Sequence, residues 1–321
     1  MEHLFIINPQ AGKPGGLRAL EGAIRALPVT WQIAYTAKAG DGERYARQAA
    51  RQGRAVRIYA CGGDGTLNEV VNGAAGYPNA AVTNVPMGTG NDFLRIFGKG
   101  SRERFRDLTA LSQGVQAEMD LMECNGRLGL DVVCAGVDAR IAEQAHRFKR
   151  LPLVRGMGAY VLSLLVNVLG RPLSRPMEVE MGAVSYTGPV TLVCVCNGRY
   201  YGGGFMPVGD NRPDDGLLEA LMVGKVSHAT FFRLVGKYAA GRYRDYPQLI
   251  KSYQGRQVRL ASADHRPLVV CVDGEVLRTQ ACTIRLSERT VNFFYPADLD
   301  YRPAMEGEAA GKMAQGQALR R

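Results

Sequence analysis

The chain has 321 residues, 46% hydrophobic and 22% charged, so it is long enough for one large domain or two ordinary ones and is neither disordered nor collagen-like in composition. Its 40 lysines and arginines against 30 aspartates and glutamates give a formal charge of +10, which favours an anionic partner: a nucleotide, a membrane surface or a nucleic acid. No apolar run reaches the roughly 18 residues of a spanning helix and the N-terminus does not resemble a secretory signal, so we expect a cytoplasmic protein.

The first 120 residues alternate between strand and helix patterns. The strand patterns are Leu4–Ile7, Trp31–Tyr35, Val56–Ala60 and Ala81–Val85. The helical patterns between them are Leu17–Leu27, Glu43–Gln52 and Leu67–Asn72. This alternation predicts a largely parallel sheet with right-handed crossovers, in which ligands bind beyond the carboxyl ends of the strands.

Short strand patterns then follow one another from about residue 118. They are Ala117–Cys124, Leu128–Cys134, Glu178–Met181, Val190–Cys196, Leu217–Val223, Val258–Ala261, Leu268–Val272, Thr283–Leu286 and Val291–Phe294. Helical patterns interrupt them at Val137–Lys149, Gly158–Leu169 and Ser227–Gly241. We therefore predict an α/β domain over 1–120, a β-rich, sandwich-like domain over 121–302 and a frayed tail over 303–321.

Seven cysteines are spread along the chain without a Cys-x2-Cys pair, and the four histidines include no His-Glu-x-x-His sequence. These spacings argue against a zinc site, a disulfide framework and a histidine-based zinc hydrolase. A reduced compartment fits the cysteines best.

Three glycine-rich turns follow strand patterns of the first domain. They are Asn8 to Lys13, Gly62 to Glu69 and Pro86 to Asp92. Glycine lets backbone N–H groups approach a phosphate, and a helix N-terminus adds a favourable field. One such turn is an ordinary connection, but three at one sheet edge indicate a nucleotide site.

The spacing of these glycines excludes two common nucleotide motifs. There is no Gly-x4-Gly-Lys-Ser/Thr sequence, and no Gly-x-Gly-x-x-Gly follows the first strand. Asp64 is an anion among N–H groups suited to phosphate, and either a hydrated Mg²⁺ beside it or a simple turn role would explain it.

Gly62-Gly63-Asp64-Gly65-Thr66 resembles the signature shared by diacylglycerol kinases, NAD kinases and 6-phosphofructokinases. The string continues to Gly73, with Asn8-Pro9-x-x-Gly12 before it and Gly88-Thr89-Gly90-Asn91-Asp92-Phe93 after it. This longer pattern resembles the diacylglycerol kinase catalytic family, which includes bacterial lipid kinases and has sphingosine and ceramide kinases as relatives. The resemblance extends to about residue 300 and implies a two-domain kinase with ATP in a cleft, Mg²⁺ as cofactor and a lipid on the second domain.

The resemblance also implies the residues that contact ATP. They are Asn8, Pro9, Gln10, Ala11, Gly12, Thr36, Gly63, Asp64, Gly65, Thr66, Leu67, Asn68, Glu69 and Thr89. Thr36 begins a turn that resembles the family's Thr-x-x-x-Gly-Asp sequence. Ala11 departs from the serine or threonine that the family often has there, so one side-chain hydroxyl contact is lost while backbone donors remain.

In the second domain, Asp214-Asp215-Gly216-Leu217 and Val272-Asp273-Gly274-Glu275 are typical of Asp-Gly hairpin turns. The resemblance implies more: Asp215, with the main-chain oxygens of Arg212 and Leu217, would hold a magnesium ion.

Two further acidic residues receive roles from the same resemblance. Glu275 would be the general base on the lipid hydroxyl, and Asp120 would join the same polar network as Asp215. Some family members have a lysine after an Ala-Tyr pair, where this chain has Ser163.

Contact with a membrane is suggested by two segments. Met157–Leu169 is apolar but too short to span, and is either a core helix or the lining of an acyl pocket. His228–Tyr246 mixes aromatic and basic residues, which suits transient binding to an anionic membrane surface or a solvated face.

Several alternatives remain open at this point. The acceptor lipid is diacylglycerol, another glycerolipid or a sphingoid base, and a homodimer is left open. An NAD kinase, a silent nucleotide sensor and a nucleic-acid-binding protein are the rivals, although no nucleic-acid-binding motif is present and we expect no nucleic acid partner.

Overall fold

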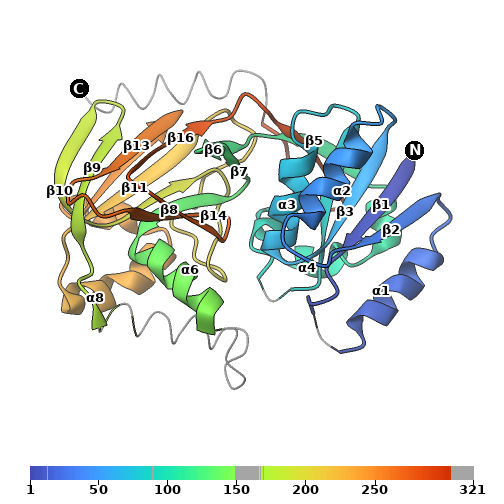
Figure 1. Ribbon diagram of the computed structural model, residues 1–321, viewed down its shortest axis with the longest axis horizontal. Coiled ribbons are helices and arrows are strands. Elements are labelled where there is room, and N and C mark those ends of the chain that lie inside the picture. Colours follow the sequence, from blue (N-terminus) through green and yellow to red (C-terminus); the bar gives the residue numbers. More distant parts are fainter. Residues whose placement is uncertain (13, 89, 149–165, 167, 169, 305–321) are drawn as a thin grey trace. The chain divides into compact units, whose positions relative to one another are not determined.

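A computed structural model describes residues 1–12, 14–88, 90–148, 166, 168 and 170–304 (Figure 1). Its internal contacts divide the chain into two compact units. Unit 1 consists of Met1–Leu121 and Ser287–Pro303, and unit 2 of Met122–Leu286 with Ala304.

Unit 1 has one six-stranded sheet in the order β2-β1-β3-β4-β17-β5. Its strands are β1 (Glu2–Ile7), β2 (Trp31–Tyr35), β3 (Val56–Gly62), β4 (Ala80–Pro86), β5 (Val115–Met119) and β17 (Val291–Tyr295). The first four strands and β17 are parallel, and only β5 is antiparallel to its neighbour. The predicted α/β class is confirmed.

Three helices of unit 1 match the predicted helical patterns, and the short elements after β4 were not predicted. In chain order, the elements are α1 (Gly16–Arg25), α2 (Asp41–Ala50), α3 (Asp64–Ala74), the 3-10 turn η1 (Phe93–Phe97), α4 (Ser101–Arg104) and α5 (Leu108–Ser112). The helix predicted to begin at Leu67 begins three residues earlier. Gly63 has an extended conformation and precedes the first helical residue, so the glycine turn itself is the start of α3.

The end of the chain differs from the prediction of one unbroken second domain over 121–302. Residues 287–303 return to unit 1, because β17 pairs with both β4 and β5. Four of its five residues are buried, as is typical of a strand covered on both faces. The first division, after Leu121, lies one residue from the predicted boundary.

Unit 2 is an antiparallel sheet in the order β15-β14-β8-β10-β9-β13-β16-β6-β7, with β11 joining β10 to β12. Its strands are β6 (Met122–Cys124), β7 (Arg127–Gly129), β8 (Val132–Gly136), β9 (Arg175–Met181), β10 (Val184–Cys196), β11 (Leu218–Gly224), β12 (Ile250–Gly255), β13 (Gln257–Ser262), β14 (Leu268–Val272), β15 (Glu275–Thr279) and β16 (Ala281–Leu286). Its helices are α6 (Val137–Phe148), α8 (His228–Ala239) and the 3-10 turn η2 (Tyr243–Asp245). The predicted β-rich class is confirmed.

The long strand β10 organises unit 2. Its first half, Val184–Val190, pairs with β9, and its second half, Leu192–Cys196, pairs with β8 and β11 after a register shift. One face of the sheet buries a core of aliphatic residues, among them Val193 and Val195. The other face of β8, β10 and β11 is covered by α6 and α8 (Figure 1).

Two predicted strands each proved to be two. Ala117–Cys124 divides into β5 in unit 1 and β6 in unit 2, and Leu128–Cys134 divides into β7 and β8. The predicted helix Gly158–Leu169 and the tail after residue 304 lie largely or wholly outside the described residues. Among the described residues, no helix has the length and apolarity needed to cross a membrane.

Candidate functional site

The three glycine turns meet at one edge of the unit 1 sheet. The strands β1, β3 and β4 are adjacent and parallel, so their carboxyl ends lie together. The first turn joins the second through the Asn8 N–H, which donates to Cys61 O at 3.0 Å. The second joins the third because Gly62 O accepts from the N–H groups of Met87 and Gly88 at 3.0 and 3.1 Å. The clustering predicted from the sequence is therefore present.

The amino end of α3 lies at the centre of this edge. The N–H groups of Asp64, Gly65 and Thr66 form its first turn and donate no hydrogen bond to another described residue. Such N–H groups, reinforced by the helix dipole, form a natural anion site. The Asn8 side-chain amide lies 3.4 Å from Thr66 Oγ1 and fixes the first turn beside them.

The third turn is held by the Asp64 carboxylate. Its two oxygens accept the N–H groups of Asn91 and Asp92, each at 2.8 Å. The negative charge is therefore met by backbone donors, and a cation is not needed to explain an aspartate here. A Cβ on Gly90 would lie 2.2 Å from Asp64 Oδ2, and one on Gly88 would lie 2.8 Å from Gly63 Cα, so both positions require glycine.

Glu69 also has a bonding partner within the protein. Its two carboxylate oxygens accept the N–H groups of Gly40 and Gly42, both at 2.9 Å. These bonds tie α3 to the amino end of α2. Thr36 lies shortly before α2, and its N–H donates a hydrogen bond to Ile7 O at 2.9 Å. The structure thus gives Glu69 a positioning contact, and the contact with ATP that the family resemblance implies stays a prediction.

Asp41 closes the turn between Thr36 and α2. Its carboxylate accepts the N–H groups of Ala37 and Lys38, at 2.9 and 3.1 Å, and pairs with Arg44. The Ala37 N–H, followed by Arg44 and Lys38, lowers the pKa of Asp41 to about 2. The carboxylate stays charged at neutral pH and holds the turn.

The remaining predicted nucleotide contacts differ in exposure. Pro9, Gln10 and Gly12 are exposed on the first turn. The side chains of Leu67 and Asn68, on the other hand, are on the buried face of α3. Gln10 and Ala11 both donate their N–H groups back to Asn8. Thr89 lies outside the described residues, as does Ser163.

In unit 2, Asp273 and Gly274 form the two-residue turn of the β14–β15 hairpin, with Val272 opposite Glu275. Both turn residues have positive φ, 45° and 94°, which the Asp-Gly pair tolerates. The Asp273 carboxylate also accepts the N–H groups of Leu130, Asp131 and Val132 at 2.5, 3.1 and 2.8 Å. The turn is therefore anchored to the start of β8.

Glu275 leaves that anchored turn as the first residue of β15. Its side chain is exposed and forms no hydrogen bond or ion pair with any other described residue. A carboxylate in this state is free to accept a proton from a molecule that approaches the turn. The predicted hairpin turn is present, and the role of Glu275 as a general base stays a prediction.

Asp215 lies just before β11, in the connection that includes Arg212 and Leu217. It is 4% exposed, and its Oδ1 accepts the Leu217 N–H at 3.2 Å. The Arg212 guanidinium pairs with Asp214, and this pair holds the Arg212 main chain close to Asp215. One carboxylate and two main-chain oxygens are hard donors of the kind Mg²⁺ prefers when it keeps several waters, so this segment fits a magnesium ion.

The described residues contain no group of three or more histidine, cysteine, aspartate or glutamate side chains arranged to hold a metal. A magnesium ion here would therefore depend on main-chain oxygens and water.

Glu275 and Asp215 lie at the same edge of the unit 2 sheet. The adjacent strands β14, β8, β10 and β11 bring Val272, Val132, Cys196 and Glu219 to this edge. Three strand spacings of about 4.8 Å separate β14 from β11, or about 14 Å in all.

Asp120 is half-buried and belongs to unit 1, where it follows β5.

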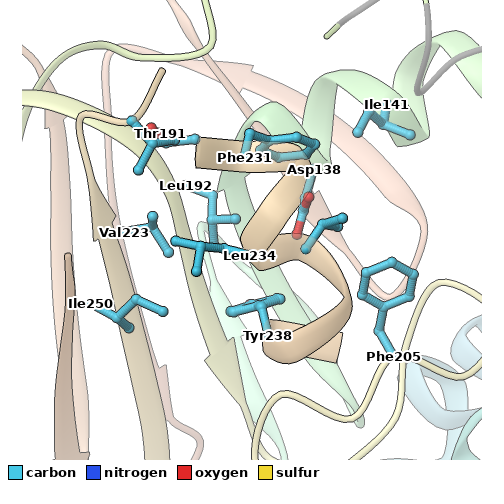
Figure 2. Close-up of a pocket in the computed structure, with 12 residues that line it drawn as sticks. Asp138, Ile141, Thr191, Leu192, Phe205, Val223, Phe231, Leu234, Tyr238 and Ile250 are labelled. Carbon is cyan, nitrogen blue, oxygen red and sulfur yellow. The ribbon is translucent and has the colours of Figure 1, made fainter. Parts of the chain in front are cut away.

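A second candidate site is an apolar pocket between α8, the start of α6 and the outer face of the sheet (Figure 2). Its cavity volume is about 50 Å³. Phe231, Leu234 and Tyr238 line it from α8, and Leu192 and Val223 from the sheet. The lining suits an apolar group such as part of a hydrocarbon chain.

One carboxyl group interrupts this apolar lining. Asp138, the second residue of α6, accepts a hydrogen bond from the Tyr201 hydroxyl through Oδ2 at 2.6 Å, and Tyr201 lies 3.3 Å from the Tyr238 hydroxyl. Burial raises the pKa of Asp138, and the bond from Tyr201 opposes that shift. Asp138 Oδ1 has no partner among the described residues, so the pocket offers one acceptor to a bound polar group (Figure 2).

Comparison with known proteins follows the division of the chain. Residues 2–124 match the model of the diacylglycerol kinase catalytic domain, and residues 131–294 match that of the YegS C-terminal NAD kinase beta sandwich-like domain. The second match alone spans half of the chain. The chain belongs to the diacylglycerol kinase family of lipid kinases.

Relatives agree with this assignment. The diacylglycerol kinase of Bacillus subtilis (strain 168) is 29% identical over 69% of this chain and 72% of its own. A Pectobacterium atrosepticum protein named as a probable YegS-like lipid kinase is 30% identical over 67% and 72%. The crystal structure of a Bacillus anthracis diacylglycerol kinase shares the fold, with a TM-score of 0.64, 20% identity and coverage of 92% and 96%.

Sequence reasoning missed three residues of this lipid kinase that the structure brings to the candidate sites. Asp273 was visible only as a turn residue, and its three N–H contacts come from a strand some 140 positions away in sequence. Asp138 stands alone in a helical pattern, and no motif marks Arg102, which contacts the third glycine turn. Long-range packing places all three.

Proposed function

We propose that this family member transfers the γ-phosphoryl group of ATP to a lipid hydroxyl, with diacylglycerol as the acceptor and phosphatidic acid as the product. The observation that carries the proposal is the convergence of three glycine turns around the N–H groups of Asp64, Gly65 and Thr66. The family membership supports the same chemistry.

The nucleotide would bind with its phosphates against the first turn of α3. The exposed first turn, with Gly12, would approach the same phosphates from β1. Because the transferring group is loose and anionic, alignment and charge neutralisation supply most of the rate enhancement. The N–H groups supply both without moving during the reaction.

Magnesium would be held in unit 2 by Asp215 and the main-chain oxygens of Arg212 and Leu217. When bound, the ion supplies positive charge that stabilises the polar network around the transferring phosphate. Asp215 would hold this charge close to the sheet edge, and we propose that Asp120 belongs to the same network.

Glu275 would accept the proton of the attacking lipid hydroxyl. Its exposure leaves both carboxylate oxygens accessible, and the anchored Asp273 turn keeps its backbone in one position. A positioned general base contributes about 10² to 10⁴-fold to such a step.

The lipid chain would occupy the apolar pocket of unit 2. Its largely apolar lining suits part of an acyl chain.

The exposed face of α8 suits transient contact with the inner, anionic face of the cytoplasmic membrane. Phe232 is 47% exposed, and Arg233 and Lys237 are exposed beside it, while Phe231 and Leu234 are buried. An aromatic side chain flanked by cations is typical of an interfacial helix. Vesicle flotation should show binding that weakens as salt is raised, and no flotation at low salt would contradict this part of the proposal.

The test is a transfer assay with γ-labelled ATP and Mg²⁺ against diacylglycerol, monoacylglycerol, a sphingoid base, ceramide and NAD. We expect label in the diacylglycerol product and none in NAD. Label in the sphingoid base alone would replace diacylglycerol as the proposed acceptor. Label in NAD alone would contradict a lipid as the substrate.

A further inference from the structure

We propose that Arg102 is a positioning residue for the nucleotide site, holding the third glycine turn in the conformation that admits a triphosphate. This inference rests on the proposed nucleotide role of that edge. Arg102 belongs to the short helix α4, outside every motif that the family resemblance carries.

The Arg102 guanidinium reaches two main-chain oxygens of the turn. Nη1 donates to Gly90 O at 3.2 Å, and Nη2 donates to Gly88 O. Gly88 O also accepts from the Asn91 side-chain amide at 3.0 Å. The carbonyl groups on both sides of position 89 are thus engaged by one planar cation.

The backbone N–H groups of the same turn are held by Asp64. Its carboxylate takes the N–H groups of Asn91 and Asp92, while Arg102 takes the carbonyl groups of Gly88 and Gly90. The turn therefore lies between an anion that holds its donors and a cation that holds its acceptors.

Such a clamp matters because glycine peptides rotate easily. Neither Gly88 nor Gly90 can carry a Cβ, since Gly63 and Asp64 occupy the space, so the side chains that usually limit rotation are excluded here. A rotated Gly88 peptide would present its carbonyl beside Gly63, immediately before the free N–H groups of α3, and would repel a phosphate bound there. Arg102 prevents that rotation and adds positive charge.

Arginine is suited to this task and lysine is not. Two donors of one rigid guanidinium can reach two carbonyl groups at once, whereas an ammonium on a flexible chain holds one point in space. We therefore expect Arg102→Lys to keep the charge and lose part of the clamp.

The experiment measures binding of Mg²⁺ with a non-hydrolysable ATP analogue by calorimetry, and KM for ATP and for lipid, in Arg102→Ala, Arg102→Lys and Arg104→Ala. Arg104 is the matched control: it lies on the same helix and pairs with Asp107 and Asp298 at the surface. We expect Arg102→Ala to weaken analogue binding and raise KM for ATP at least about tenfold, since two bonds of a charged donor are lost, with KM for lipid unchanged. Arg102→Lys should fall between it and wild type.

Equal analogue affinity in Arg102→Ala and Arg104→Ala would overturn the inference, and so would full affinity in Arg102→Lys if the alanine variant does not fold. A parallel rise in KM for ATP and lipid would also overturn it, because it would indicate a general structural role. Failure of the wild-type protein to bind the analogue would instead contradict the proposed function.

Discussion

The candidate nucleotide site of unit 1 and the candidate lipid pocket of unit 2 are built from different parts of the polypeptide. In unit 1 the groups proposed to face the nucleotide are backbone N–H groups at the start of α3, and side chains such as Asp64 and Glu69 hold the backbone in place. In unit 2 the groups proposed to face the lipid are side chains: an apolar lining with Asp138 and, at the sheet edge, Glu275.

This difference determines how each region should respond to substitution. A backbone site is damaged by changes that move the main chain and tolerates changes of exposed side chains nearby. A side-chain site loses one function at a time, because each side chain acts separately. The predictions below test this contrast.

The largest effect is expected for Glu275→Gln. The amide cannot accept the proton of the lipid hydroxyl, so kcat should fall at least about 100-fold while ATP affinity persists. Stability should be unchanged because Glu275 is exposed and unpaired among the described residues. The control is Glu178→Gln, an exposed glutamate on β9. Turnover within a few-fold of wild type would remove Glu275 from the role of base.

Gly90→Ala should damage the backbone site. The added Cβ would lie 2.2 Å from Asp64 Oδ2, so the third turn must move. We expect ATP affinity to fall at least about tenfold, as overpacking typically costs 1–3 kcal/mol, with lipid binding unaffected. Gly16→Ala is the control, because a Cβ there meets nothing within 4 Å. Equal ATP affinities by calorimetry in the two variants would show that the turn does not contribute.

Asp138→Asn should affect the lipid and leave ATP binding unchanged. We expect KM for the lipid to rise about threefold, because the bond from Tyr201 that holds the lining in place is weakened. Because burial raises the pKa of Asp138, its charge disappears at a higher pH than that of an exposed carboxyl as acid is added. KM for the lipid should therefore rise as pH falls in the wild type and not in Asp138→Asn, and the same pH dependence in both would contradict this role.

The smallest effect is expected for His3 in unit 1, which accepts from or donates to the Tyr59 hydroxyl at 2.8 Å. Burial, then Arg57 and the N-terminus, lower the pKa of His3 from 6.5 to about 4. The unfolded chain binds a proton in that window and the folded chain does not, so stability falls as pH drops from 6.5 towards 4.

In the wild type, the free energy of unfolding of unit 1 should fall as the pH drops from 7 to 5. In His3→Gln this fall should be smaller by about 1 kcal/mol, a value discounted for partial solvation of the ring. Denaturation at pH 7 and 5, followed by fluorescence, measures it, since Trp31 is the only tryptophan and lies in β2. The same pH dependence in wild type and His3→Gln would contradict the assignment.

The sequence predicted the backbone site better than the side-chain sites, for a physical reason. Glycine turns after parallel strands occur at fixed spacings, and adjacent strands bring them together, so Gly62 and Gly88 could be placed beside each other before the structure was known. The return of β17 to unit 1 was not predictable in this way, because a buried apolar strand fits either sheet.

Side-chain contacts between distant segments carry no local pattern. Asp273 is held by N–H groups of β8, Asp138 by Tyr201, and Arg102 reaches Gly88 from a separate helix. Asp64 illustrates the limit within a motif: its identity was clear, but its two backbone partners at Asn91 and Asp92 were visible only in the structure.

The most direct test of the account is a crystal structure of the protein with Mg²⁺ and a non-hydrolysable ATP analogue. We predict that the triphosphate lies against the N–H groups of Asp64, Gly65 and Thr66, with Asp64 still bonded to the third turn. A triphosphate bound elsewhere, or an edge closed by side chains with no nucleotide, would contradict it.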